Sequence, residues 1–244
     1  MEDEKKFLEG LFENYIKSSD SSYLRLMRES MVEKCKPYIK EGVIALELGC
    51  EIGYMTSLIS PLVMQLFVMD GSESFIKEAK KQNLQNVSFQ NMLFEDLDEN
   101  EKYGCVFMSH VVEHLVNPKH VLEKARAALK PGGFIFITIP NARALSRQLA
   151  KSMGLLNNLY ALTPTDIRGG HRRVYDKDTI ELEVHSAGFK IEEVSGILVK
   201  PFCDFQMDEL IDSKFLEKQH LEGLLKLGKD YPDICGDIFA VGRK

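Results

Sequence analysis

Short apolar runs alternate with amphipathic stretches along most of this chain. Runs of this length, bounded by glycine, proline or polar residues, predict strands buried on both faces. The predicted strands cover residues 43–46, 66–70, 86–89, 105–109, 134–139, 190–196 and 238–241. The predicted helices among them cover 54–60, 73–82, 118–129, 178–187 and 208–227. Strands that alternate with helices favour a doubly wound α/β fold with a mostly parallel seven-stranded sheet.

Two segments fall outside this alternation. Apolar residues at helical spacing over 4–17 and about 22–36 predict two helices ahead of the first strand, which would form a cap. Residues 141–177 form a long irregular connection after the fifth strand, and such connections are usually lids or binding loops. We therefore expect a single domain. Its parts are a helical cap (1–41), a ligand-binding core (42–140), a lid (141–177) and the end of the sheet (178–244).

Polar residues follow several of the predicted strands. Right-handed crossovers place the carboxyl ends of parallel strands on one rim of the sheet. That rim gathers Glu47, Asp70, Phe94, residues 109–114 and residues 140–141. The convergence predicts a ligand site, which in doubly wound sheets lies beyond the carboxyl ends of the strands.

The turn after the first strand is the clearest candidate for ligand contact. Gly49 and Gly53 allow the backbone to bend sharply and to approach a ligand closely. Asp70 is placed to accept hydrogen bonds from both hydroxyls of a ribose, unless it serves as an acid at a helix N-terminus. Glu47 either lies near this ligand or is a structural acid bonded to loop amides.

The same turn lacks the features that hold a pyrophosphate. It has neither the second nor the third glycine of the dinucleotide fingerprint, and it contains no basic residue. Glu51 would repel phosphate groups. The sequence therefore favours a nucleoside ligand without phosphates and disfavours an NAD-linked oxidoreductase.

The overall composition limits the partners and the compartment. The 244 residues carry a net charge of −6, which argues against a broad surface for nucleic acid or anionic membrane. The five cysteines are scattered without CxxC spacing, as in proteins with reduced thiols. We expect neither a signal peptide nor a membrane-spanning run. We expect a cytoplasmic protein, either a monomer or a homodimer.

Four segments, in order along the chain, resemble the motifs of one enzyme family. They are residues 46–54, 68–71, 109–114 and 129–133. They resemble those of the class I S-adenosylmethionine-dependent methyltransferases, and most closely the group with the ubiquinone-biosynthesis O-methyltransferases and many small-molecule and sugar methyltransferases. The resemblance covers about residues 40–195. It implies the Rossmann-like methyltransferase fold, and S-adenosyl-L-methionine as the cofactor.

The resemblance also implies a place for each matching residue. The methionine part of the cofactor would lie beside Glu47, Gly49 and Gly53. The motif that holds the ribose contains Asp70 and Gly71. The adenine would lie between Leu93 and Phe94, and the sulfonium near Ser109 and His110.

Two positions depart from the family pattern. Glu51 replaces the middle glycine of the first motif, and Leu93 stands where an acid often meets the adenine amino group. These departures favour a rival interpretation, in which the chain is a non-catalytic cofactor-binding partner protein that kept the fold.

Methyl transfer from a sulfonium needs proximity, alignment and a deprotonated acceptor. A neutral histidine suits proton removal near pH 7. His114, after the fourth strand, and His171, on the predicted lid, are the candidate catalytic residues. The alternatives are that His114 orients the rim by hydrogen bonding and that His171 stabilises its loop.

The spacing of His110, Glu113 and His114 supports a further alternative. Residues three and four apart share one helical face, so with His171 they would supply a set of ligands for a divalent metal. This set resembles that of the metal-dependent small-RNA 2′-O-methyltransferases, which have an acid at the His110 position. Our main interpretation includes no metal ligand.

The sequence as a whole predicts S-adenosylmethionine-dependent methyl transfer to a small-molecule acceptor, at oxygen rather than nitrogen. Three arginines on the predicted lid are either a solvated face or a grip on an acidic acceptor. They are Arg168, Arg172 and Arg173. We expect no nucleic-acid and no membrane partner. The alternatives left open are the non-catalytic partner protein and a metal-assisted RNA 2′-O-methyltransferase, which the acidic net charge opposes.

Overall fold

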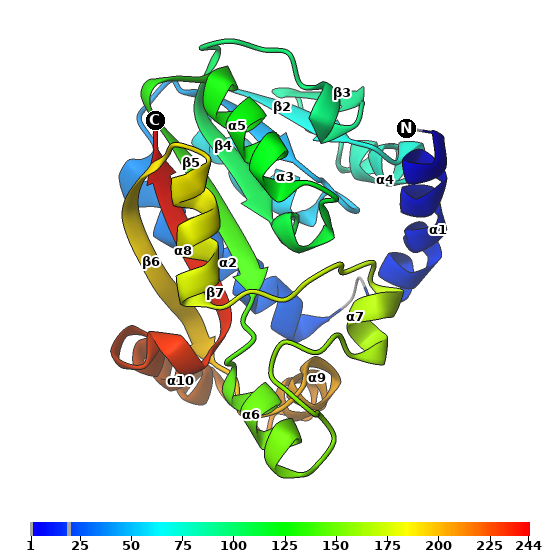
Figure 1. The fold of residues 1–244 in the computed structure, drawn as a ribbon, viewed down its shortest axis with the longest axis vertical. Helices are drawn as coiled ribbons and strands as arrows, with labels where there is room; N and C mark the ends of the chain where they lie inside the picture. Colours follow the sequence, from blue (N-terminus) through cyan, green and yellow to red (C-terminus); the bar gives the residue numbers. More distant parts are fainter. Residues whose placement is uncertain (1, 19–20) are drawn as a thin grey trace.

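A seven-stranded sheet forms the centre of the protein (Figure 1). The computed structural model describes residues 2–18 and 21–244. The strands are β1 (Ile44–Leu48), β2 (Gln65–Asp70), β3 (Val87–Asn91), β4 (Tyr103–Ser109), β5 (Leu129–Pro140), β6 (Lys190–Val199) and β7 (Cys235–Arg243), in the order β3-β2-β1-β4-β5-β7-β6. Strands β1 to β5 pair in parallel, whereas β7 runs antiparallel to both β5 and β6. The predicted doubly wound, mostly parallel sheet is confirmed.

Helices cover both faces of this sheet. They are α1 (Glu2–Ser18), α2 (Ser22–Cys35), α3 (Tyr54–Ile59), α4 (Glu73–Ala79), α5 (Pro118–Ala128), α6 (Leu145–Ser152), α7 (Pro164–Arg168), α8 (Lys177–Ser186), α9 (Asp204–Asp212) and α10 (Lys218–Asp230). One hydrophobic core lies between the sheet and α5 and α8, and a second lies between the opposite face and α2, α3 and α4. Two buried faces explain why the central strands are apolar throughout rather than alternating.

Side-chain caps begin several helices where the sequence places a good capping residue. The Ser72 hydroxyl accepts the Phe75 N–H at α4, and the Asn117 side chain accepts the His120 N–H at α5. The predicted start of α8 at Asp178 was wrong. Asp176 and Thr179 form the capping box instead, so the helix begins one residue before Asp178.

The predicted helix over 208–227 is two helices. The chain turns between α9 and α10, where Lys214 has a left-handed backbone with φ of 60°. A pattern of apolar residues that continues through a short turn does not reveal the break.

Helix α1 connects two parts of the rim that are far apart in sequence. The Leu8 side chain packs so closely on Gly71 that a Cβ atom there would lie 2.4 Å from Leu8 Cδ1. Leu11 packs on Gly170 in the same way, at 2.7 Å. The predicted helices of the cap therefore exist, and α1 touches both the end of β2 and the loop after α7. Across the described residues, no helix is long and apolar enough to span a membrane.

Candidate functional site

The candidate site lies where the strand order reverses, between β1 and β4. The neighbouring strand on one side is β2, and the carboxyl ends of β1, β2 and β4 carry Glu47, Asp70 and Ser109. Ligands of doubly wound sheets bind in this crevice. The structure thus brings together the residues that the sequence placed on one rim.

Backbone geometry explains the glycines of the turn after β1. Gly49 and Gly53 have φ of 83° and 88°, a left-handed conformation that favours glycine. A Cβ atom at Gly53 would lie 2.9 Å from Ala79 Cα, and one at Gly49 would lie 2.7 Å from a methyl group of Val111. The turn is therefore packed tightly against α4 on one side and the segment after β4 on the other.

Asp70 joins this turn to the end of β2. Its Oδ2 accepts the Cys50 N–H at 3.0 Å, and its Oδ1 accepts the Ser72 N–H at 2.9 Å. Burial raises the pKa of Asp70 although these amides oppose the rise. A carboxylate offers about four acceptor positions, so capacity remains for the hydroxyls of a ligand.

Glu47 is a buried acid without a hydrogen bond. The side chain is 1% exposed, and neither carboxylate oxygen has a partner among residues 2–18 and 21–244. Burial raises its pKa to about 8, and the nearby Thr56 hydroxyl and the charge of Arg28 oppose this rise only in part. The alternative of a structural acid bonded to loop amides finds no support in the structure. An unpaired buried carboxylate fits a cationic ligand group.

Leu93 and Phe94 lie against the same turn. Leu93 Cδ2 would be 3.0 Å from a Cβ atom on Gly71, and Phe94 Cζ would be 3.8 Å from one on Gly49. Leu93 is buried and Phe94 is partly exposed. These two side chains thus line the site from the segment after β3.

His110 pairs with an acid that the sequence analysis missed. Its Nε2 lies 2.9 Å from Asp237 Oδ2, and its backbone is left-handed with φ of 53°. Although burial lowers it, the Asp237 carboxylate holds the pKa of His110 above its ordinary value. Asp237 lies near the start of β7, which reaches the rim because β7 is antiparallel. A lone acid within the apolar strand 235–241 was the available signal.

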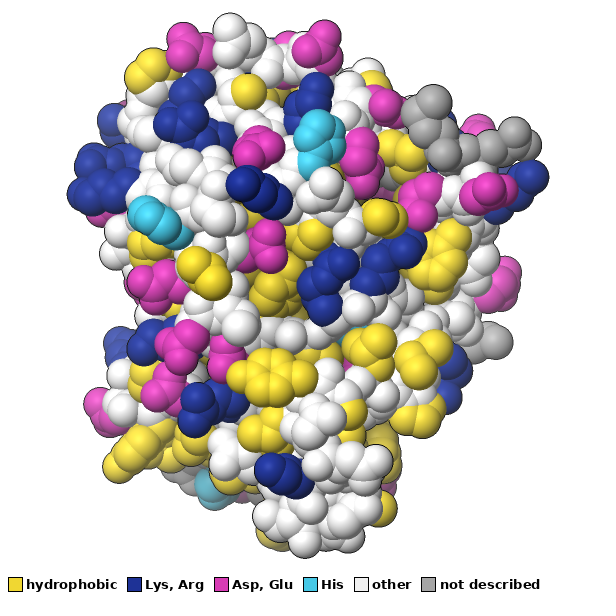
Figure 2. All heavy atoms as spheres, in the orientation of Figure 1, with side chains coloured by type: hydrophobic (Ala, Val, Ile, Leu, Met, Phe, Trp, Pro, Cys, Tyr) yellow, Lys and Arg dark blue, Asp and Glu magenta, His cyan; other side chains and the backbone are white. Residues whose placement is uncertain are grey.

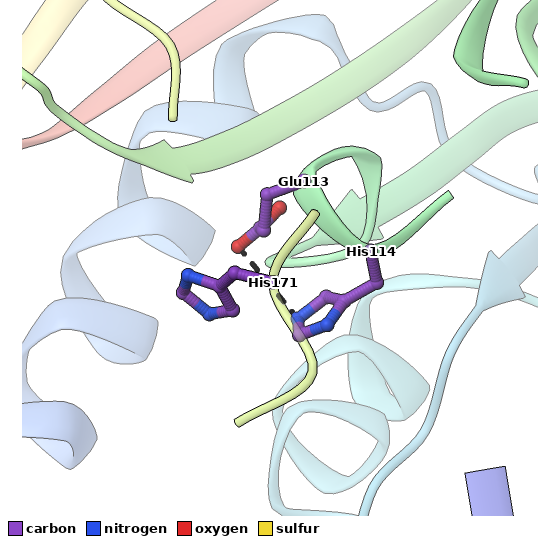
Figure 3. A group of neighbouring side chains, drawn as sticks. All are labelled: Glu113, His114 and His171. Carbon is purple, nitrogen blue, oxygen red and sulfur yellow. Dashed lines mark ion pairs between the residues drawn. The ribbon is translucent and has the colours of Figure 1, made fainter. Parts of the chain in front are cut away.

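Glu113 and His114, which follow β4, form a cluster with His171, which follows α7 (Figure 3). One potential ligand atom from each lies within 4.8 Å of the others, and the two imidazole rings meet edge-on with centroids 4.7 Å apart. Glu113 is buried, and its carboxylate has no hydrogen-bond partner in the described part of the chain. Two nitrogens and one oxygen suit a divalent transition metal. His110 is absent from this group, so three of the four predicted ligands come together.

The environment of His114 keeps its ring neutral. Burial, followed by the charge of His171, lowers its pKa to about 3. The Tyr15 hydroxyl lies 3.4 Å from His114 Nε2 and donates to the Gly169 carbonyl at 3.1 Å. His114 is therefore suited to hydrogen bonding or metal ligation rather than to carrying a proton.

The loop that carries His171 is fixed to the segment after β4. His171 Nδ1 lies 3.4 Å from Asp166 Oδ1, and the Arg172 N–H donates to the Glu113 carbonyl at 2.9 Å. Arg172 also binds the His114 carbonyl and pairs with Glu4, while Arg173 donates to the Leu115 carbonyl. These two arginines are thus engaged by protein groups, which weakens their predicted role as a grip on an acidic acceptor.

Comparisons with known proteins agree with this geometry. A family model described as a methyltransferase domain matches residues 22–194. The ubiquinone biosynthesis O-methyltransferase of Nitrobacter winogradskyi is 29% identical over 171 residues, which cover 67% of this chain and 62% of that relative. This chain therefore spans less than two thirds of the length of that relative.

Solved structures with the same fold extend the comparison. A SAM-dependent methyltransferase from Aquifex aeolicus aligns with a TM-score of 0.63 at 16% identity, covering 95% of this chain and 97% of that one. The N-methyltransferase NodS of Bradyrhizobium japonicum, in complex with S-adenosyl-L-homocysteine, aligns with a TM-score of 0.58 at 14% identity, covering 93% and 90%. Likeness at these identities establishes the shared fold.

Proposed function

This chain belongs to the class I S-adenosylmethionine-dependent methyltransferases, and from that premise we propose that it methylates a hydroxyl group of a small molecule. The observation that carries the proposal is the cradle at the β1–β4 crevice, where the unpaired Glu47 carboxylate and the Asp70 carboxylate flank a tight glycine turn. Oxygen as the target is supported by the name of the 29% identical relative, an O-methyltransferase. The unpaired cysteines, four of them buried, support a reducing compartment such as the cytoplasm.

The residues of the cradle fit the cofactor of this family. When bound, S-adenosylmethionine supplies a methyl group that its sulfonium activates. We assign the ammonium group of the amino-acid end to Glu47, and the rest of that end to the backbone of Gly49 and Gly53. Asp70 and Gly71 would hold the ribose, Leu93 and Phe94 the adenine, and Ser109 and His110 would face the sulfonium. Calorimetry with S-adenosylhomocysteine and with the cofactor tests these assignments, and the absence of binding of either would refute them.

On the acceptor side, we assign His171 as the group that takes the hydroxyl proton and His114 as its neutral neighbour. Asp166 holds the His171 ring, and the edge-on contact fixes both imidazoles relative to each other. The rival, a non-catalytic partner protein, predicts cofactor binding with no transfer to any acceptor. Transfer of labelled methyl groups to a panel of phenolic, sugar and carboxylic acceptors separates the two.

We expect His171→Asn to lower turnover by roughly 100-fold or more, the usual size of a lost general base. Cofactor affinity should change by less than about twofold, because His171 lies outside the cradle. The matched control is His185→Asn on the exposed face of α8, which should leave both quantities unchanged. Full turnover in His171→Asn would remove the residue from the mechanism.

A second candidate mechanism uses the same cluster as a metal site. The observation that favours it is the buried Glu113 carboxylate, which lacks a partner although it lies beside two imidazoles. A bound divalent cation would acidify an acceptor hydroxyl. If the acceptor were RNA, as in the RNA 2′-O-methyltransferases, the net charge of −6 would oppose its binding. The face shown in Figure 2 carries intermixed acidic and basic side chains rather than a broad basic area.

Chelation distinguishes the two mechanisms. The first mechanism predicts that turnover survives exhaustive treatment with a chelator and that the purified protein contains less than about 0.1 equivalents of metal by mass spectrometry. Loss of turnover that a divalent cation restores, together with loss of metal in Glu113→Gln, would favour the metal-assisted mechanism.

A further inference from the structure

An ion pair joins the helical cap to the glycine turn of the cradle. Arg28, on α2, binds the Glu51 carboxylate through Nη2. Both side chains are largely covered, with 11% and 20% of their surfaces exposed. Glu51 has φ of 49°, a left-handed backbone that a non-glycine residue adopts only with strain. The sequence therefore places a glutamate with a strained backbone where its carboxylate neutralises the charge of Arg28.

Arg28 lies against the glycine turn of the cradle, because its guanidinium binds Glu51 within that turn. Its charge also makes a small contribution that lowers the pKa of both Glu47 and His110. It donates a single hydrogen bond, to Glu51, and its other N–H groups have no partner within the described residues. An arginine in this state has donors available for a carboxylate.

The charges around Arg28 decide how well such a carboxylate binds. Glu47, Glu51 and Asp70 are acids of the cradle, and Arg28 is a cation that pairs with one of them, Glu51. Because Glu51 compensates the charge of Arg28, an incoming carboxylate gains little attraction from the guanidinium. Without Glu51, the same guanidinium would attract it.

We propose that Glu51 is an internal counter-ion of Arg28 that weakens binding of the carboxylate-bearing amino-acid end of the cofactor. This inference rests on the proposed function, because it concerns the same cradle. S-adenosylhomocysteine, which remains after methyl transfer, carries the same carboxylate, so Glu51 also lowers retention of the product. Glu51 thus keeps the affinity for the cofactor lower than it would be without this negative charge.

The test compares two ligands that share the adenosyl group. S-adenosylhomocysteine has the amino-acid end, and 5′-methylthioadenosine lacks it. By titration calorimetry, Glu51→Gln should tighten S-adenosylhomocysteine binding about 5- to 20-fold, the effect of one partly covered charge. Binding of 5′-methylthioadenosine should change by less than about twofold. In the double variant Arg28→Met/Glu51→Gln, the gain in affinity for S-adenosylhomocysteine should disappear.

Two further variants make the result specific. Glu222→Gln, on α10, changes the net charge equally and should leave both affinities unchanged. Glu51→Gly removes the charge together with the backbone strain, so agreement with Glu51→Gln assigns the gain to charge. Unchanged or weaker S-adenosylhomocysteine binding in Glu51→Gln would overturn the proposal. If the natural chain binds neither ligand, the proposed function fails and this inference fails with it.

Discussion

Replacing Asp70 with alanine is expected to weaken cofactor binding by about 1.5–3 kcal/mol, which is a factor of roughly 10 to 150 in Kd. The carboxylate that would accept the ribose hydroxyls is lost. The same carboxylate also accepts the Cys50 and Ser72 amides, so the variant loses the connection between the glycine turn and the start of α4. Two buried amides are left without acceptors, and the free energy of unfolding should fall as well.

The comparison with Asp70→Asn separates binding from folding. Asparagine keeps one carbonyl acceptor but no negative charge, so it should retain more stability than alanine while still binding the cofactor weakly. Titration calorimetry at a temperature well below both unfolding midpoints measures the affinities. An unchanged Kd in a folded Asp70→Ala variant would remove Asp70 as the ribose anchor.

Replacing Glu47 with glutamine is expected to stabilise the ligand-free protein, increasingly as the pH rises. In the folded chain the pKa of Glu47 is raised to about 8 by burial, whereas in the unfolded chain it is ordinary, near 4.5. The native state therefore holds the proton more tightly. This contribution to stability is complete below the unfolded pKa and is lost as the pH rises to 8. Glutamine does not titrate, so the variant keeps this stability at high pH. At pH 8.5 we expect the free energy of unfolding of the variant to exceed that of the natural protein by on the order of a few kcal/mol.

The same substitution should cost cofactor affinity. A cationic ligand group favours the ionised form of Glu47, so binding at pH 7 should release protons. Calorimetry in buffers of different ionisation enthalpy would detect this release, which should be absent in Glu47→Gln. Thermal unfolding from pH 5 to pH 9 provides the stability profile. Parallel profiles for the two proteins would show that Glu47 does not titrate in this range.

The sheet could be predicted because each buried strand is a short apolar run in the sequence, and the turns around it are rich in glycine and polar residues. The cradle could be predicted for a related reason. Gly49, Gly53 and Asp70 follow those runs directly, and parallel strands bring their carboxyl ends to one edge. Local sequence and topology together specify this part of the site.

Contacts between distant segments could not be predicted in the same way. The pairing of His110 with Asp237 joins residues 127 positions apart and depends on the antiparallel direction of β7. An antiparallel strand brings its beginning, not its end, to the rim, so a search for residues after strands overlooks Asp237. The ion pair of Arg28 with Glu51 likewise depends on how α2 packs on the turn, which helical periodicity does not specify.

Helix α1 links the two halves of the site through side chains that alternate along its length. Besides the contacts of Leu8 and Leu11, Glu9 accepts the Glu73 N–H at the start of α4, and Glu4 pairs with Arg172, which also binds the backbone of Glu113 and His114. A ligand that displaces or orders this helix on one side of the site changes the cost of binding on the other side. Thermodynamic reciprocity then requires cofactor and acceptor to alter each other's affinity by the same factor.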